Sequence, residues 1–443
     1  MAIQVGTRIT TEFGRRLDVV EKLGEGGQGI VYEVDCAGKH MAFKWLKPEA
    51  VLDRDRYVAN LKRNILAGAP TSEFLWPQDM CYEVEGSVGY LMDLRPAEYK
   101  ELDRIWLRPS AIESFHRTVD VCLGVAMAMN NLHNAGYRYQ DLKGENVFAD
   151  PRTGRVLICD CDNVTPQGES TGIAGTVGFM APEIMCASHP NPTVASDMHS
   201  MAVVIFITLL LQHPLHGQRL ASIPMDEEGF RYVYGTHPVF IFDEEDASNA
   251  AVQSPENNAL RIWPCLPAHM QALFRRAFSK EALHEPGRRP LEVEWMRELA
   301  RFRSEIVACP CGNEVFLEGG TLERRCESCG RLCRAELYLE VPVGRAPDNR
   351  VPVVDDARVY RCQVQRVCNQ GQELEPQVWA LASTRDPRDI ALRNVSGRPW
   401  EASAGGRSLE VAPGQMVRAI EGMELRVLGQ TLRVCRNKEE DGR

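Results

Sequence analysis

Hydrophobic and polar positions alternate in two different ways along the chain. Residues 17–45 contain short apolar runs separated by turn residues, and residues 80–94 show the same pattern, so both segments predict strands. Residues 48–66 carry apolar side chains at helical spacing and predict a helix between them. Helical periodicity then dominates three longer segments, residues 110–136, 195–212 and 267–303. Strands followed by helices are typical of an α+β fold.

The character of the chain changes after Arg303. Cysteine, glycine and arginine crowd residues 309–334, and beyond residue 338 apolar and polar positions nearly alternate, which predicts antiparallel strands. We therefore expect three units. They are residues 10–303, a short cysteine-bearing unit over residues 304–337, and a small all-β sandwich over residues 338–443.

Composition and charge exclude several classes of protein. The 443 residues are 44% hydrophobic and 25% charged, as in an ordinary folded protein, and the net charge of −10 lacks the basic footprint of a nucleic-acid binder. The longest apolar run, Met201–Leu211, is too short to span a bilayer, and the first residues lack the pattern of a secretory signal. We expect a soluble, cytoplasmic protein that binds neither nucleic acid nor membrane.

A glycine cluster between the first strands is the first candidate for chemistry. Gly24, Gly26 and Gly29 form a G-x-G-x-x-G pattern that connects two strands, and Lys44 lies inside the following apolar strand. Alone, the glycines are explained by ordinary turns and the lysine by an exposed strand edge. A glycine-rich lip between two strands can also fold over phosphate groups with its backbone N–H groups.

Four polar residues further along favour the second interpretation. Asp141, Lys143 and Asn146 lie between a predicted helix and a strand, and Asp160 follows the next strand. Transfer of a phosphoryl group needs a carboxylate that accepts a hydroxyl proton, a lysine that offsets phosphate charge, and oxygen ligands for Mg²⁺. These residues supply all three.

Residues 10–303 resemble the eukaryotic-like, bacterial Ser/Thr protein kinase family. The resemblance is carried, in the family's order, by the segments LGEGGQGIVYEV, AFK, YQDLKGENV, DCD, GTVGFMAPE and SDMHSMAVV. It implies a bilobal domain, with a small lobe over residues 10–95 and a large lobe over residues 96–303. It also implies an ATP-dependent enzyme that transfers the γ-phosphate to a protein hydroxyl. Arg289 stands where the family has an arginine that pairs with Glu183 of the APE motif.

The resemblance also implies a role for each matching residue. Asp141 would accept the proton of the substrate hydroxyl and Lys143 would stabilise the transferred phosphoryl group. Asn146 and Asp160 would hold Mg²⁺. The set implied for ATP and its metal is Gly24, Gly26, Gly29, Val31, Ala42, Lys44, Met92 as gatekeeper, Asp93 and Arg95 through their backbone at adenine, Asn146 and Asp160.

Three departures from the family pattern affect the site. Gln140 replaces the arginine before the catalytic aspartate, so an activation-loop phosphate would lose its usual partner. Cys161 and Asp162 replace the Phe and Gly of the DFG motif, and Asp162 is interpreted as a solvated turn residue rather than a second metal ligand. The helical glutamate that should pair with Lys44 is absent. The acids considered in its place are Asp55, Glu73 and Asp160.

Four cysteines in two short turns indicate a metal site. Cys309 and Cys311 precede Cys326 and Cys329, and a glycine closes each turn. Such a spacing can place four thiolates around a structural Zn²⁺ ion and resembles a zinc ribbon, with Cys333 as a substitute ligand. The alternative is a set of reduced cysteines without metal.

The last hundred residues predict partner recognition rather than catalysis. Their closing strands faintly resemble forkhead-associated domains, which bind phosphothreonine, but that family's serine-and-histidine pattern is not found. An interaction or regulatory module is the default. Besides a protein substrate, bacterial kinases with appended ribbons imply a phosphatase or a von Willebrand-type partner. Two rival functions stay open, a nucleotide-binding pseudokinase scaffold and a kinase-fold adenylyl or small-molecule phosphotransferase.

Overall fold

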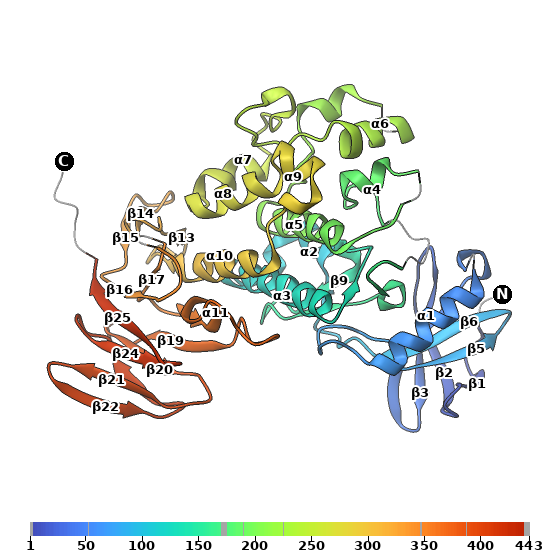
Figure 1. Cartoon of the computed structure of the whole chain (residues 1–443), viewed down its shortest axis with the longest axis horizontal. Coiled ribbons are helices and arrows are strands. Elements are labelled where there is room, and N and C mark those ends of the chain that lie inside the picture. Colours follow the sequence, from blue (N-terminus) through green and yellow to red (C-terminus); the bar gives the residue numbers. More distant parts are fainter. Residues whose placement is uncertain are drawn as a thin grey trace.

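The computed structural model describes residues 3–51, 53–169, 175–188, 190–224, 226–345, 348–386 and 388–437. Figure 1 shows three parts along the long axis of the molecule. A twisted sheet with one helix lies at one end, a helical part lies in the centre, and a second β-rich part lies at the other end.

The first part is a six-stranded antiparallel sheet in the order β1-β2-β3-β4-β6-β5. Its apolar side chains form two buried clusters. The helix α1 (Arg54–Ala67) begins at the capping carboxylate of Asp53 and ends at Gly68. The strands are β1 (Arg8–Thr10), β2 (Arg16–Glu25), β3 (Gly29–Cys36), β4 (Lys39–Leu46), β5 (Asp79–Val84) and β6 (Ser87–Asp93).

The central part is built around three long helices. They are α3 (Phe115–Asn134), α5 (Val194–Leu210) and α10 (Glu292–Glu305). The apolar run of the sequence lies at the end of α5 and extends to its C-cap residue Leu211, and most side chains of this helix are buried. No helix in the described part of the chain is both long and apolar enough to cross a membrane. The smaller helices are α2 (Leu102–Leu107), α4 (Pro182–Cys186), α6 (Glu227–Arg231), α7 (Asn258–Ile262), α8 (Ala268–Ala277) and α9 (Lys280–His284).

Short strands of this central part lie next to the first sheet in Figure 1 and carry the loops that matter for function. Strand β9 (Val147–Ala149) pairs with both β7 (Lys100–Glu101) and β10 (Val156–Ile158). Strand β8 (Tyr137–Arg138) pairs with β11 (Thr165–Pro166). The loops that precede β9 and follow β10 therefore lie beside each other.

The third part begins with two hairpins and continues as two packed sheets. The hairpins are β12 (Ile306–Ala308) with β13 (Glu314–Phe316) and β14 (Glu323–Arg325) with β15 (Leu332–Arg334). One sheet has the order β17-β16-β25-β24-β21-β22 and the other β18-β19-β20-β23, and a single apolar core lies among these strands. Their bounds are β16 (Leu337–Glu340), β17 (Arg350–Pro352), β18 (Arg358–Tyr360), β19 (Pro376–Ala382), β20 (Ile390–Asn394), β21 (Trp400–Ala404), β22 (Arg407–Val411), β23 (Met416–Arg418), β24 (Glu424–Val427) and β25 (Gln430–Arg436), and α11 (Arg361–Val364) follows β18.

The third part is fixed to the central part through α3 and α10. The ring of Phe302 on α10 packs edge-on against Phe115 of α3 and Phe316 of β13. Arg303 is fully buried between the carboxylates of Asp120 and Asp356, at 2.6 and 2.8 Å. These contacts hold the C-terminal sheets at the end of the molecule opposite the first sheet (Figure 1).

Candidate active site

The glycines where β2 turns into β3 differ in how much space surrounds the position that a side chain would occupy. A Cβ atom on Gly24 or Gly26 would meet no atom within 4 Å, so both lie beside open space. A Cβ on Gly29 would collide with the backbone carbonyl of Trp45 on the paired strand β4. Close strand pairing therefore requires Gly29, whereas nothing in the described fold requires Gly24 and Gly26 to be glycine.

An apolar wall lies behind the glycine-rich turn. Val31 of β3, Ala42 of β4 and Met92 of β6 belong to one cluster of packed side chains. Leu157 and Cys159, which the sequence analysis did not single out, join it from the other side of the cleft. The apolar run of β10 just before Asp160 is the sequence signal that could have found them.

Asp93 and Arg95, the first and third residues after Met92, engage their side chains with polar or aromatic partners outside this wall. The Asp93 carboxylate accepts hydrogen bonds from Lys39 at 2.8 Å and from Gln78 at 2.7 Å. Arg95 donates to the carbonyl of Tyr99 and stacks over the ring of Phe148. Any contact of Asp93 and Arg95 with a nucleotide would use their backbone.

Lys44 is a buried cation between β4 and the segment that follows β10. Its side chain is only 5% exposed, and Nζ lies 3.0 Å from Oδ1 of Asp160 and 3.3 Å from Oδ1 of Asp162. Burial by itself disfavours the charged amine, but the two carboxylates overcome it and raise the pKa of Lys44 above its usual value. Lys44 is therefore charged at neutral pH. Asp55 and Glu73 are not among its described carboxylate partners.

The interpretation of Asp162 as a solvated turn residue is wrong. Its side chain is 1% exposed, and Oδ1 and Oδ2 accept hydrogen bonds from the hydroxyls of Tyr90 and Tyr57, at 2.7 and 2.8 Å. Although burial raises the pKa of this carboxyl group, Lys44 and the two hydroxyls lower it below its usual value. A buried carboxylate is stable here because every partner it needs is present.

The loop before β9 brings the predicted catalytic groups together. Oδ1 of Asp141 accepts a hydrogen bond from the hydroxyl of Thr176 at 2.6 Å. Nζ of Lys143 lies 3.7 Å from Oδ2 of Asp141 and 3.0 Å from Glu145. The amide nitrogen of Asn146 donates to the backbone carbonyl of Asp141 at 2.9 Å. This bond directs one end of the Asn146 amide into the loop and leaves its oxygen as a ligand for a cation.

The loop before β9, which carries the predicted catalytic groups and is called the catalytic loop below, is held in place by the buried side chain of Asp197. The two oxygens of Asp197, at the start of α5, accept the backbone N–H groups of Tyr139 and Gln140 at 2.6 and 2.9 Å. His133 of α3 lies between Asp197 and Glu292 of α10. Burial disfavours the charged imidazole, but these two carboxylates raise the pKa of His133 to about 9.

Gln140 stands where the family has an arginine, and it makes a different kind of contact. Its side-chain amide donates to the carbonyl of Asn163 at 2.6 Å and to the hydroxyl of Thr165 at 2.8 Å. It therefore ties the catalytic loop directly to the segment after Asp160 by neutral hydrogen bonds. A different contact fixes the segment that begins with Gly175: Arg289 forms a bidentate ion pair with Glu183, at 2.8 and 2.7 Å.

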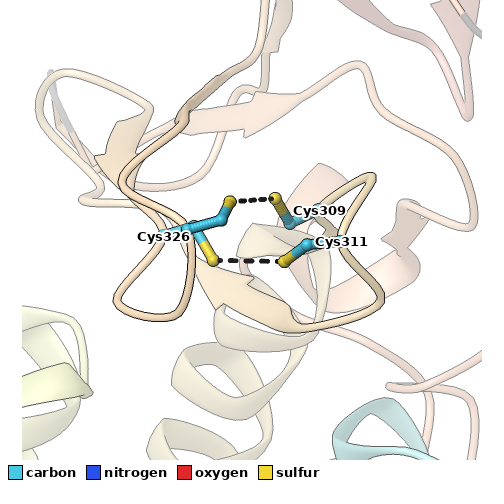
Figure 2. A group of neighbouring side chains, drawn as sticks. Cys309, Cys311 and Cys326 are labelled. Atoms are coloured by element: carbon cyan, nitrogen blue, oxygen red, sulfur yellow. Dashed lines mark hydrogen bonds between the residues drawn. The ribbon is translucent and has the colours of Figure 1, made fainter.

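The four predicted cysteines lie together at the start of the third part. Their sulfur atoms are all within 4.8 Å of one another, with 3.6 Å between Cys309 and Cys329 and between Cys311 and Cys326. Figure 2 shows Cys309 and Cys311 on one turn facing Cys326 on the opposite turn. Cys333 lies outside this group of four.

The chemistry of this cluster fits a zinc ion. Backbone N–H groups, that of Cys329 first, lower the pKa of Cys326 to about 7, which favours the thiolate that binds metal. Four sulfur ligands from two turns would fill all four coordination positions of a zinc ion. This matches a closed structural site rather than a catalytic one. The four thiols come from two hairpins, β12–β13 and β14–β15, which an ion would hold together.

A two-lobed fold with a buried lysine, a glycine-rich turn and an Asp-Lys-Asn loop in one cleft defines a protein kinase domain. The family model described as protein kinase domain matches residues 17–260, more than half of the chain. The chain belongs to this family.

Similar proteins include several eukaryotic kinases. The Danio rerio "Ribosomal protein S6 kinase alpha-6" is 27% identical over 46% of this chain and 28% of its own length. The Macaca fascicularis "Serine/threonine-protein kinase Nek11" is 26% identical over 49% of this chain and 35% of its own length. The match thus spans only about a third of these relatives or less. Among solved structures, the PknI kinase domain of Mycobacterium tuberculosis has a TM-score of 0.44 and 20% identity, covering 68% of this chain and all of that chain.

Proposed function

We propose that the protein is an ATP-dependent Ser/Thr protein kinase that transfers the γ-phosphate of ATP to a protein hydroxyl. The observation that carries this proposal is the single network formed by Lys44, Asp160, Asn146 and Asp141. Nζ of Lys44 lies 3.0 Å from Asp160, the backbone N–H of Cys159 donates to the carbonyl of Asn146 at 3.0 Å, and the Asn146 amide donates to Asp141. Groups suited to the phosphates, the metal and the substrate hydroxyl are therefore joined in one network of contacts.

ATP would bind with its base against the apolar wall. Val31, Ala42 and Met92 supply flat apolar surface there, and the open backbone at Gly24 and Gly26 can approach the phosphates. Lys44 would neutralise charge on the α- and β-phosphates. Gly29 supports this arrangement indirectly, through the pairing of β3 with β4.

Mg²⁺ held by Asn146 and Asp160 would supply charge neutralisation between the β- and γ-phosphates. Asp160 is suited to this role because its side chain is one-third exposed and faces the cleft beside Lys44. The Asn146 amide nitrogen donates within the loop, and its oxygen accepts no hydrogen bond from the described residues, so it can serve as a ligand. Both are oxygen ligands of the kind Mg²⁺ prefers.

The residues of the catalytic loop divide the remaining work. Oδ1 of Asp141 is occupied by the hydroxyl of Thr176, which leaves Oδ2 to accept the proton of the incoming Ser or Thr hydroxyl. As the oxygen of the Ser or Thr hydroxyl forms a bond to the γ-phosphorus, the bond between that phosphorus and the β,γ-bridging oxygen breaks. ADP leaves with the electron pair of the broken bond. Lys143, 3.7 Å from Oδ2, would offset the charge that develops on the transferred group.

Ser and Thr are the proposed acceptors because Lys143 occupies the position that Ser/Thr kinases use in this loop. The printed names of the similar proteins also favour this class. The rival adenylyl or small-molecule transferase is disfavoured by the segment ending in Glu183, which in the family positions peptide substrates. The rival scaffold without activity rested on the absent helical glutamate and on Cys161.

The C-terminal units have a proposed supporting role. We assign residues 304–337 to a zinc ribbon with Zn²⁺ on Cys309, Cys311, Cys326 and Cys329, and residues 338–443 to a β-sandwich that binds partners or regulates the kinase. A phosphatase or von Willebrand-type partner, a phosphothreonine ligand and a cytoplasmic location stay predictions of the sequence.

The deciding experiment compares two radiolabels on the wild type and on Asp141→Asn. With γ-labelled ATP, Mg²⁺ and a mixture of serine- and threonine-containing proteins, the wild type should transfer label and the variant should lose at least about a hundredfold in rate. With α-labelled ATP neither should transfer label. Transfer of α-label would establish adenylylation, and equal γ-transfer by both proteins would reject the assigned catalytic aspartate.

A further inference from the structure

Helix α1 presents no acidic side chain to Lys44. The residues of α1 that reach the cleft are Tyr57, Asn60 and Asn64, all of which are neutral. Asp55, the acid in the first turn of the helix, is exposed. A buried ammonium group still needs a counter-charge, so the partner of Lys44 must come from another element.

Asp162 supplies that counter-charge from the segment after β10. Its Oδ1 lies 3.3 Å from Nζ of Lys44 and accepts the Tyr90 hydroxyl, and its Oδ2 accepts the Tyr57 hydroxyl. Because the described partners occupy both oxygens and the side chain is 1% exposed, Asp162 is not available as a second metal ligand. The lysine and the two hydroxyls around Asp162 together keep its carboxylate charged and beside Lys44.

The surrounding contacts also fix the position of α1. The Asn60 amide donates to the backbone carbonyls of Asp162 and Val164, at 3.1 and 2.9 Å, and the Asn64 amide donates to Val164 at 2.9 Å. The helix is thus attached to the segment that carries Asp162 by neutral hydrogen bonds. An ion pair between α1 and Lys44 is not needed to hold the helix against the cleft.

We propose that Asp162 is the positioning residue that holds Lys44 in place to bind phosphate, in place of a carboxylate on α1. The inference rests on the proposed function, in which Asp160 would be a ligand of Mg²⁺. Asp160 and Asp162 are the two carboxylates that contact Lys44 in the described chain. Once Asp160 is engaged by the metal, Asp162 keeps the ammonium group directed at the α- and β-phosphates.

The test compares the binding of ADP with that of adenosine, because only ADP carries the phosphates that Lys44 would contact. Isothermal titration calorimetry with Mg²⁺ is run on the full chain of the wild type, Asp162→Asn and, as a matched control, Asp55→Asn. Asp162→Asn should bind ADP about tenfold more weakly and adenosine within about twofold of the wild type, since one charge-assisted contact is lost. Asp55→Asn should bind both as the wild type does.

A relocation variant tests positioning against a purely structural role. The Tyr57 hydroxyl lies 2.8 Å from Asp162, so position 57 is a place on α1 from which a side chain points toward the carboxylate beside Lys44. Adding Tyr57→Glu to Asp162→Asn should restore most of the ADP affinity. Unchanged ADP binding in Asp162→Asn, an equal loss of ADP and adenosine binding, or no recovery in the double variant would each overturn the proposal.

These measurements are independent of phosphoryl transfer. If the wild type binds ADP but transfers no γ-label, the proposed kinase activity fails, while a selective loss of ADP binding in Asp162→Asn still supports the role of Asp162. If γ-label is transferred and Asp162→Asn keeps full ADP affinity, the activity stands and the positioning role fails.

Discussion

Replacing Arg303 by methionine should loosen the C-terminal sheets from the kinase domain. Arg303 is fully buried on α10, donates to Asp120 of α3 and to Asp356 between β17 and β18, and also donates to the Asp356 carbonyl at 2.8 Å. Methionine keeps most of the volume of the side chain but removes the charge. It leaves two carboxylates without their shared cation.

The size of the effect follows from the exposure of those carboxylates. Breaking a fully buried ion pair by removing one partner costs about 3–5 kcal/mol. The side chains of Asp120 and Asp356 are 13% and 26% exposed, so water reduces the penalty after the substitution. Asp356 also keeps Arg358 as a partner at 3.1 Å. We therefore expect a loss near the lower limit, about 3 kcal/mol.

Urea unfolding of the full chain, together with limited proteolysis, measures this loss. Arg303→Met should lower the free energy of unfolding by about 3 kcal/mol and expose new cleavage sites after α10. Arg288→Met is the matched control, because Arg288 pairs with Glu285 at the surface, where their side chains are 69% and 61% exposed. The control should unfold as the wild type does. A change below about 1 kcal/mol in Arg303→Met would refute the interface role of this arginine.

Three further predictions concern pH, metal and packing. Because His133 has a folded pKa of about 9 against 6.5 for the free side chain, its stabilisation is complete below pH 6.5 and is lost as the pH rises through 9. The wild type should therefore lose up to about 3 kcal/mol more over this range than His133→Gln does in urea unfolding, and parallel profiles would contradict the assignment. Replacing Cys326 and Cys329 by serine should remove the one zinc ion per chain that atomic absorption is expected to find in the wild type. The variant should have less stable C-terminal units but an ADP affinity within about twofold of the wild type. Zinc bound to the variant would contradict the site. Gly144→Ala should reduce transfer at least about tenfold because a Cβ there would collide with the Asp103 carboxylate, and full activity would show that the loop adapts.

The catalytic motifs were predictable because each one is local. The glycine pattern before β3, the lysine in β4 and the Asp-Lys-Asn loop before β9 are each contained in a few consecutive residues. Their order along the chain, together with the strands and helices around them, was enough to predict a bilobal kinase domain. The family match over residues 17–260 confirms that prediction.

Lys44 has two carboxylate partners in the described chain: Asp160 was among the acids considered from the sequence, whereas Asp162 was not predictable, for the opposite reason. Asp162 lies 118 residues from Lys44 in the sequence, and its charge is tolerated because Tyr57 and Tyr90, from two other elements, donate hydroxyls to it. An aspartate after a strand is usually a solvated turn residue, so the local pattern favoured the wrong interpretation. The attachment of the C-terminal sheets is missed in the same way, because it depends on a buried arginine whose partners lie on α3 and between β17 and β18.

The structure of the full chain with Mg²⁺ and a non-hydrolysable ATP analogue tests the central claim most directly. The account predicts that Nζ of Lys44 contacts the α- and β-phosphates while Asp162 keeps its contact with the lysine, and that Asn146 and Asp160 bind the metal. The γ-phosphate should then face Asp141. A nucleotide bound elsewhere, or one bound in this cleft with its γ-phosphate directed away from Asp141, would contradict the account.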